Sequence, residues 1–195
     1  DDGDSTITVT LTLNKKDYVT KITATTSDSE DDADGNVASV TYKESKDTGT
    51  VKIGSKTYDI DDVDDVDISI TDGSDKIKTW EDFYNAYKDK KTMNVSATVK
   101  NDEVTKITGK VTQAKGELSK LGKNYIKITG KYSDNDFSYD FDEDDTDNIK
   151  VSITNASGVK TLTKLIDWLE SGDKLDLVLT LDKNGNITKI SGEYE

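Results

Sequence analysis

The segment VDISITDGSDKIKTWEDFYNAYKDKKTMNVSATVKNDEVTKITG, residues 66–109, decides the organisation of the chain because it occurs twice in recognisable form. Its second copy is IKVSITNASGVKTLTKLIDWLESGDKLDLVLTLDKNGNITKISG, residues 149–192. Apolar phase and turn position align together, and Ser69-Ile70-Thr71 coincides with Ser152-Ile153-Thr154. Similarity at a fixed separation is the signature of a repeat architecture. The alignment therefore predicts two units of one fold.

A third, partial copy precedes these two units. STITVTLTLNKKDYVTKIT, residues 5–23, aligns without a gap with DKLDLVLTLDKNGNITKIS, residues 173–191. We expect the tail of one unit followed by two full units, as if taken from a longer array. The predicted division is 1–36 (the terminal hairpin of a preceding repeat plus an acidic insertion), 37–110 (repeat unit 1) and 111–195 (repeat unit 2). The hairpin is expected to pack on the first full unit or to pair with it.

The pattern within each unit predicts a mainly β, α+β fold. KTYDI (56–60) and FSYDF (137–141) alternate apolar and polar residues, as half-buried strands do. The period then changes to that of a helix, at Trp80, Phe83, Tyr84 and Tyr87 in one unit and at Leu162, Leu165, Ile166 and Leu169 in the other. Each unit is therefore expected to be a small antiparallel barrel or sandwich with one short helix over an open end.

The helix faces also bear on ligand binding. The aromatic face could be a sugar platform, but the aliphatic residues at the same positions of the other unit favour a core role. Thr79 and Thr161 stand where N-cap residues belong. Trp168 lies off the main stripe and is expected at an edge or interface.

The junctions between units differ. VTKITGKVTQA, residues 104–114, runs from the last strand of one unit into the first strand of the next, which predicts a short, stiff junction near Gly109-Lys110. TSDSEDDADGN, residues 26–36, has no counterpart at that junction and is predicted to be a loop or disordered. Within it, Glu30, Asp32, Asp34 and Gly35 resemble the start of a calcium loop, but the closing Glu is missing and an acidic linker is favoured.

Composition restricts the function. The net charge is −14, which argues against nucleic acid as a partner and against an anionic membrane surface. No apolar run is long enough for membrane insertion. The chain has no Cys, His or Arg, so catalysis would depend on Asp, Glu, Lys, Ser, Thr and Tyr. No recognisable catalytic constellation occurs, and we predict that the protein is not an enzyme.

Two aligned acidic stretches follow the KTYDI and FSYDF strands. Carboxylates in a loop can supply several of the six to eight oxygen ligands that calcium takes. The alternative is a solvated acidic loop, which is the usual state of a charge run. Both alternatives stay open, and the candidate metal ligands are Asp61, Asp62, Asp64, Asp65, Asp142, Asp144, Asp145 and Asp147.

KTWEDFYNAYKDK (78–90), the LTLDKNGNITKI hairpin (179–190) and the Thr/Asp/Lys-rich composition carry a resemblance. The chain resembles tandem repeats of exported Gram-positive proteins, particularly clostridial S-layer and cell-wall proteins. The resemblance implies an extracellular location at the bacterial cell surface, a structural or spacer role, and assembly linked to calcium. The expected partners are neighbouring copies of the same protein or a cell-wall polymer. The alternative is an adhesion module that binds a glycan or a protein through loops beside the acidic strands or through Trp168.

Overall fold

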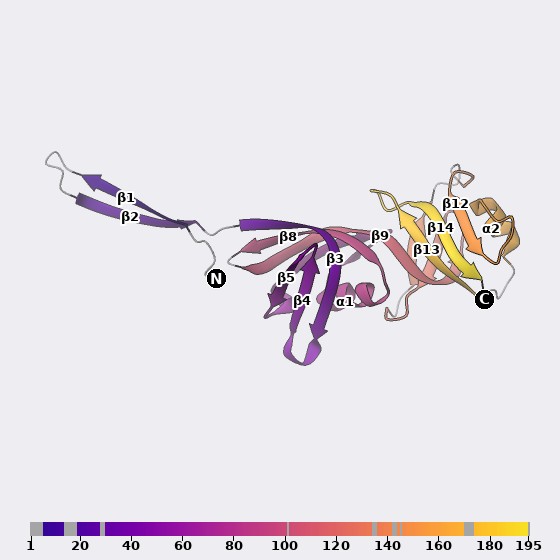
Figure 1. Cartoon of the computed structure of the whole chain (residues 1–195), viewed down its shortest axis with the longest axis horizontal. Helices are drawn as coiled ribbons and strands as arrows, with labels where there is room; N and C mark the ends of the chain where they lie inside the picture. The colour runs from indigo at the N-terminus through magenta and orange to yellow at the C-terminus, as the bar shows by residue number, and fades with distance from the viewer. Residues whose placement is uncertain are drawn as a thin grey trace.

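The computed structural model describes residues 6–13, 19–27, 30–100, 102–133, 136–141, 144, 146–169 and 174–194. It shows a β-rich α+β fold, as predicted. In Figure 1 a hairpin precedes two β-rich bodies, called here the first and second halves. The hairpin is β1 (Thr6–Leu13) and β2 (Val19–Ser27). Among the described residues, no helix has the length and apolar content needed to span a membrane.

The two halves use similar elements in the same order. The first half contains β3 (Glu30–Lys43), η1 (Glu44–Lys46), β4 (Thr48–Ile53), β5 (Lys56–Ile60), η2 (Val63–Asp65), β6 (Asp67–Asp72), β7 (Asp75–Ile77), α1 (Trp80–Lys88) and β8 (Thr92–Lys100). Strand β9 (Glu103–Leu121) leads into the second half. That half contains β10 (Tyr125–Thr129), β11 (Asp136–Asp140), β12 (Lys150–Thr154), α2 (Leu162–Trp168), β13 (Leu175–Leu181) and β14 (Ile187–Tyr194).

Strand β9 belongs to both halves. Its N-terminal part pairs antiparallel with β8 and parallel with β6, and its C-terminal part pairs antiparallel with β13 and β10. Gly109 lies opposite Val95 of the first half, and Gly116 lies opposite Leu177 of the second. The junction expected at Gly109-Lys110 is therefore a continuous strand.

The strand registers of the two halves agree with the sequence alignment. Ile70 of β6 pairs with Gly109 of β9, and the aligned Ile153 of β12 pairs with the aligned Gly192 of β14. Both pairs are parallel. A Cβ atom on Gly109 would lie 2.8 Å from Val95 Cα, so the strands approach closely at this glycine.

The expectation of small barrels is wrong, because the described strands form open sheets. One path of hydrogen-bonded neighbours runs β12-β14-β13-β9-β8-β3-β4-β5. Strand β3 pairs with β8 up to Asn36 and with β4 from Val37 onward, just as β9 changes partners along its length. Because β3 and β9 each change partners along their length, the sheet continues from one set of strands to the next and does not close on its first strand.

The helices begin where predicted. Thr79 Oγ1 accepts a hydrogen bond from Asp82 N, and Thr161 Oγ1 accepts one from Lys164 N. Trp80 and Phe83 of α1 are buried in the core, as are Leu162 and Leu165 of α2. Trp80 and Phe83 thus have the core role that is predicted for the aromatic face, whereas Tyr84 and Tyr87 are half-buried.

The acidic insertion does not form the predicted loop over residues 30–36. These residues are the start of β3 and pair with β8, from Glu30 opposite Lys100 to Asn36 opposite Asn94. Asp32 and Asp34 are exposed while Ala33 between them is half-buried. Asp32 and Asp34 occupy outward positions of a strand, where charge is compatible with pairing, and the composition of the segment obscured this alternation.

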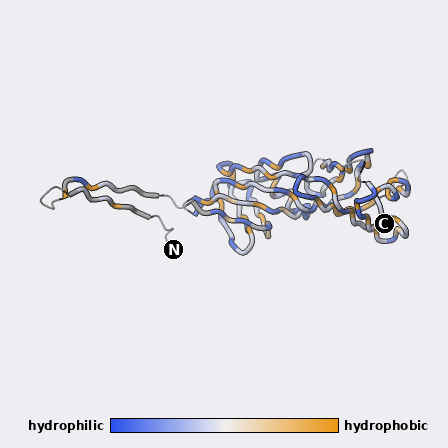
Figure 2. Tube along the Cα trace, turned by 90° about the horizontal axis from the view of Figure 1, so that it is seen from above, coloured by the Kyte–Doolittle hydropathy of each residue, from blue (hydrophilic) through white to orange (hydrophobic). Residues whose placement is uncertain are grey.

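The hairpin also differs from expectation, because β1 and β2 pair with each other in a separate two-stranded sheet. Figures 1 and 2 both show it extending away from the two halves. Its partly apolar character is visible in the hydropathy colouring of Figure 2.

The close strand contact at Gly109 generates the first prediction. In Gly109→Val the side chain would meet the carbonyl of Asn94, so we expect the free energy of unfolding to fall by about 1 to 3 kcal/mol through overpacking. Urea denaturation measures the change. Lys106→Ala, at an exposed position of the same strand, is the control and should change stability by less than about 0.5 kcal/mol. Equal stability of the two variants would contradict the close approach.

Candidate functional site

The β6–β7 turn of the first half fits closely against the second half. Gly73, in the turn, has φ +60°, and a Cβ atom there would lie 2.5 Å from Ser138 O and 2.8 Å from the ring of Tyr139. Ser74 donates hydrogen bonds from N and from Oγ to Ser138 O, at 3.4 and 3.3 Å. A side chain at position 73 would therefore separate the two halves.

A buried polar trio lies beside this turn. Asp72 ends β6, Lys91 follows α1, and Tyr139 comes from β11 of the second half. The hydroxyl of Tyr139 donates to Asp72 Oδ1 at 2.7 Å, and Lys91 Nζ forms an ion pair with Asp72 Oδ2. Lys91 Nζ also lies 3.1 Å from the centroid of the Phe137 ring. The carboxylate of one half is thus shared by an ammonium of the same half and a phenol of the other.

Burial controls the ionisation of the trio. Desolvation lowers the pKa of the Lys91 ammonium, and the neighbouring Asp72 carboxylate opposes this effect. Desolvation, followed by the charge of Asp72, raises the pKa of the Tyr139 phenol. Among the described residues, no buried side-chain nitrogen or oxygen lacks a hydrogen-bond partner. A closed and fully paired network favours a structural role over catalysis, which needs a group that substrate can reach.

Asp89 makes a second polar contact between the halves. Its Oδ1 accepts a hydrogen bond from Tyr132 N at 2.7 Å, and its Oδ2 accepts one from Ser133 Oγ. Asp89 is buried, and Gly130 passes so close that an added Cβ atom would collide with its carboxylate. The loop after β10 is therefore held on the end of α1.

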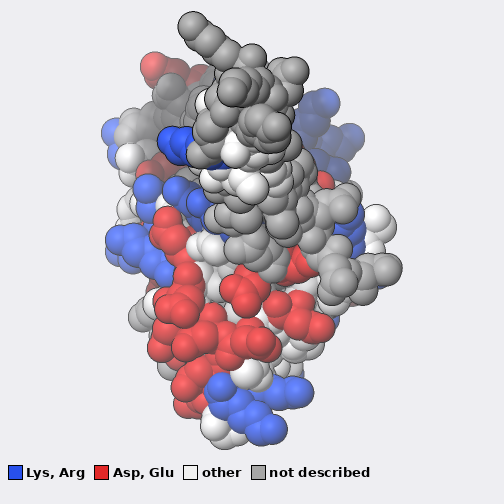
Figure 3. Space-filling model, turned by 90° about the vertical axis from the view of Figure 1, so that its left-hand side faces the viewer, with Lys and Arg blue, Asp and Glu red and all other residues white. Residues whose placement is uncertain are grey.

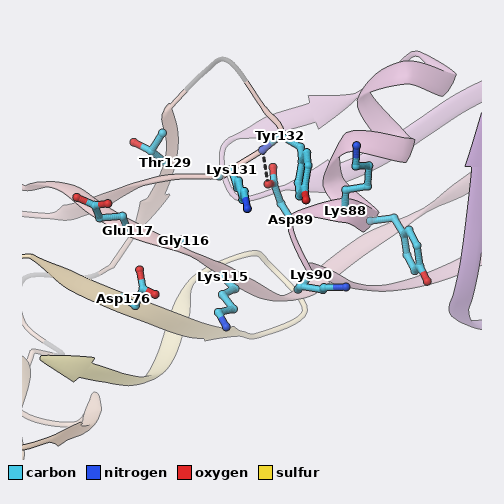
Figure 4. A pocket seen from close by; sticks show the side chains of 12 residues that line it. Lys88, Asp89, Lys90, Lys115, Gly116, Glu117, Thr129, Lys131, Tyr132 and Asp176 are labelled. Carbon is cyan, nitrogen blue, oxygen red and sulfur yellow. Dashed lines mark hydrogen bonds between the residues drawn. The ribbon is translucent and has the colours of Figure 1, made fainter. Parts of the chain in front are cut away.

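A cleft of about 720 Å³ opens beside Asp89, between the end of α1 and two strands of the second half. Figure 4 shows its lining residues. They are Tyr87, Lys88, Asp89, Lys90, Lys115, Gly116, Glu117, Thr129, Gly130, Lys131, Tyr132 and Asp176. The cleft exists only because the two halves are joined in this orientation, since both halves contribute lining residues.

The first acidic stretch lies at the surface around η2. Asp61, Asp62, Asp64 and Asp65 are all exposed, while Val63 between them is buried and anchors the loop. Asp62 Oδ1 accepts a hydrogen bond from Asp64 N at 3.0 Å, so one carboxylate caps the short helix. Figure 3 shows acidic side chains gathered over the N-terminal-facing side of the first half.

The second acidic stretch is described in part. Asp142 and Asp145 lie outside the described residues. Asp144 is exposed, and Asp147 Oδ1 accepts a hydrogen bond from Thr163 Oγ1 of α2 at 3.1 Å. Within the described part of the chain, no group of three or more acidic side chains is placed to hold a metal ion. The calcium hypothesis stays a prediction.

Sequence reasoning missed the polar trio, although one signal for it exists. Ile68 and Ile70 occupy the inward positions of β6, and Asp72 continues the same alternation. A carboxylate in an apolar phase at a strand end is unusual, because a buried charge needs a partner. Its partners could not be found from the sequence, since Lys91 and Tyr139 reach Asp72 only through the packing of two halves.

Trp168, for which an edge or interface position is predicted, lies against the last strand of the second half. It is half-buried, and its ring packs edge-on against Tyr194 of β14 with the ring centroids 4.8 Å apart. This contact gives the indole a packing role at the C-terminal end of the second half.

No protein-family model matches the chain, and no curated protein or solved structure matches it either.

The trio generates a prediction with a matched control. Tyr139→Phe removes a hydrogen bond to a buried carboxylate and should lower the free energy of unfolding by about 1.5 to 3 kcal/mol. Tyr58 occupies the aligned position in the first half, where it is half-buried and its hydroxyl makes no hydrogen bond to a described residue. Tyr58→Phe should therefore change stability by less than about 0.5 kcal/mol.

The pH dependence separates this effect from a loss of packing. Tyr139 stays protonated in the folded state at a pH where the unfolded state ionises, because its folded pKa is raised. Stability from this group is fully present below about pH 10 and falls as the pH rises further. Urea denaturation above that pH should show a smaller decline for Tyr139→Phe than for the parent. An identical slope in both proteins would contradict the raised pKa.

Calcium binding can be tested by thermal melting in millimolar calcium and in chelator. A cation held by the acidic stretches of the folded state alone should raise the melting temperature. Magnesium at the same ionic strength is the control for screening of the negative charge. An unchanged midpoint in calcium relative to magnesium would reject the eight predicted ligands as a calcium site.

Proposed function

We propose that the chain is a non-enzymatic structural spacer of a bacterial surface protein, built from tandem units of one fold. The observation that carries the proposal is strand β9, whose 19 residues are hydrogen-bonded into both halves. The equal registers at Gly109 and Gly192 support the tandem arrangement. A continuous strand resists bending between units in a way that a flexible linker does not.

The exposed side of the β1–β2 hairpin also supports the tandem arrangement. Val9, Val19 and Ile22 are 54%, 49% and 67% exposed, which is unusual for apolar residues on a strand. The aligned residues of the second half, Leu177, Ile187 and Ile190, are all buried. In the second half, this face lies in the core together with β12 and α2. We infer that a further unit of the same kind covers the hairpin in the same way.

The extracellular location and the partners of the spacer follow from the sequence resemblance. Neighbouring copies of the protein or a cell-wall polymer are the proposed partners. The negative surface in Figure 3 would keep parallel copies apart unless cations intervene. A second candidate function, an adhesion module for a glycan or a protein, is favoured by the cleft between the halves.

The spacer proposal is tested by adding one unit. In the test variant, residues 110–192 are repeated once directly after Gly192, so that β14 can continue as β9 does. Small-angle X-ray scattering should show a longer, equally stiff rod, because the new junction repeats a shared strand. A matched variant with a flexible Gly/Ser linker at the new junction is the control. Scattering from the test variant that indicates a hinged particle, as in the control, would contradict the proposal.

A further inference from the structure

The cleft between the halves has the size of a small-molecule site. Its volume of about 720 Å³ is within the roughly 300 to 1,000 Å³ of typical ligand pockets. One wall is the end of α1 with the loop after β10, and the other is formed by β9 and β13 (Figure 4). These walls are fixed by the bonds of Asp89 to Tyr132 and Ser133, so the cleft is largely preformed.

Four lysines line the cleft, although the chain as a whole has a net charge of −14. They are Lys88, Lys90, Lys115 and Lys131. Among the described residues, none of the four has a carboxylate oxygen within 4.0 Å. The aromatic ring of Tyr132 lies between two of them, with Lys88 Nζ 4.0 Å and Lys131 Nζ 5.7 Å from its centroid. This cluster presents positive charge to a bound molecule.

The wall formed by β9 and β13 carries Lys115 together with two carboxylates in an unfavourable arrangement. Glu117 of β9 and Asp176 of β13 are direct partners in the antiparallel register, so their side chains project from the same face. Like charges at directly opposed positions destabilise a strand pair. The structure therefore maintains a repulsive pair at the edge of a cleft.

The first half shows what a neutral version of this pair looks like. By strand register, Asn36 and Asn94 are equivalent to Glu117 and Asp176, because each pair is next to a glycine pair, Gly35–Val95 in one half and Gly116–Leu177 in the other. The two asparagines form a hydrogen bond of 3.3 Å. Asn94 lines a different cleft of about 410 Å³, which also contains Lys110 and Lys183 but no part of α1. The carboxylate pair thus occurs at the copy of the position that shares a cleft with the end of α1 and with the lysines around Tyr132.

We propose that this cleft binds a small zwitterion, such as an amino acid or a short peptide. Its ammonium group would lie between Glu117 and Asp176, where it can donate to both carboxylates and remove their repulsion. Its carboxylate or phosphate would lie against the lysines around Tyr132. A simple anion would meet the two carboxylates and a simple cation would meet the lysines, so the site selects molecules that carry both charges.

The test uses three probes of similar length, namely ε-aminohexanoate, hexanoate and hexylamine. Each is titrated into the full chain while the backbone amide resonances of Gly116, Gly130 and Tyr132 are followed by NMR. We expect saturable shifts with ε-aminohexanoate, and an affinity lower by about tenfold or more for the two singly charged probes, as loss of one charged contact predicts. No saturable shift with ε-aminohexanoate, or equal binding of either singly charged probe, would overturn the proposal.

The chain itself supplies the matched variant. Glu117→Asn combined with Asp176→Asn reproduces the Asn36–Asn94 pair of the first half, so it should fold with a melting temperature at least equal to that of the parent. Its affinity for ε-aminohexanoate should fall by about tenfold or more. Lys131→Met should weaken binding similarly, whereas Lys183→Met, on a different cleft of the same junction, should leave it unchanged. Unaltered binding by the double Asn variant would overturn the assignment of the ammonium position.

Discussion

The backbone hydrogen bonds of β9 join the two halves more directly than any side-chain contact does. Strand β9 pairs with β6 and β8 at one end and with β10 and β13 at the other. Rotation of one half against the other would distort this ladder, and an unpaired buried backbone group is costly. Closed barrels would have given two separate bodies on a linker. The open sheets are therefore a consequence of the same continuity that fixes the orientation of the halves.

The polar trio restricts the twist of one half relative to the other. A ladder limits bending, but it leaves twist about the strand to be set by packing. The Tyr139 hydroxyl reaches Asp72 only in one orientation of the halves, and the close fit at Gly73 excludes others. A buried ion pair such as Lys91–Asp72 adds little net stability, because desolvation offsets the Coulomb attraction. We interpret its role here as specificity of orientation, with the hydrogen bond from Tyr139 carrying the connection to the second half.

The sequence predicted those features that depend on local pattern. The helix starts at Thr79 and Thr161 and the continuous junction at Gly109 follow from caps, periodicity and alignment. It did not predict the strand over residues 30–36, because composition suggested a loop while the alternation of Asp32 and Ala33 was too short to outweigh it. Barrel closure and the partners of Asp72 depend on which strands meet in space, and a single sequence carries little information about that.

The core explains why the halves depend on each other. Buried apolar residues form one cluster that includes members of both halves, from Val40 to Ile190. A unit of roughly 80 residues buries a smaller fraction of its surface than a larger domain does, and its stability alone is correspondingly lower. With only 32% hydrophobic residues, this chain has few apolar groups to spare for two independent cores. Because the two halves share β9, the buried residues of this strand belong to a core that includes side chains of both halves. For the same reason, contact with a further unit would bury the exposed apolar face of β1–β2 and stabilise the hairpin.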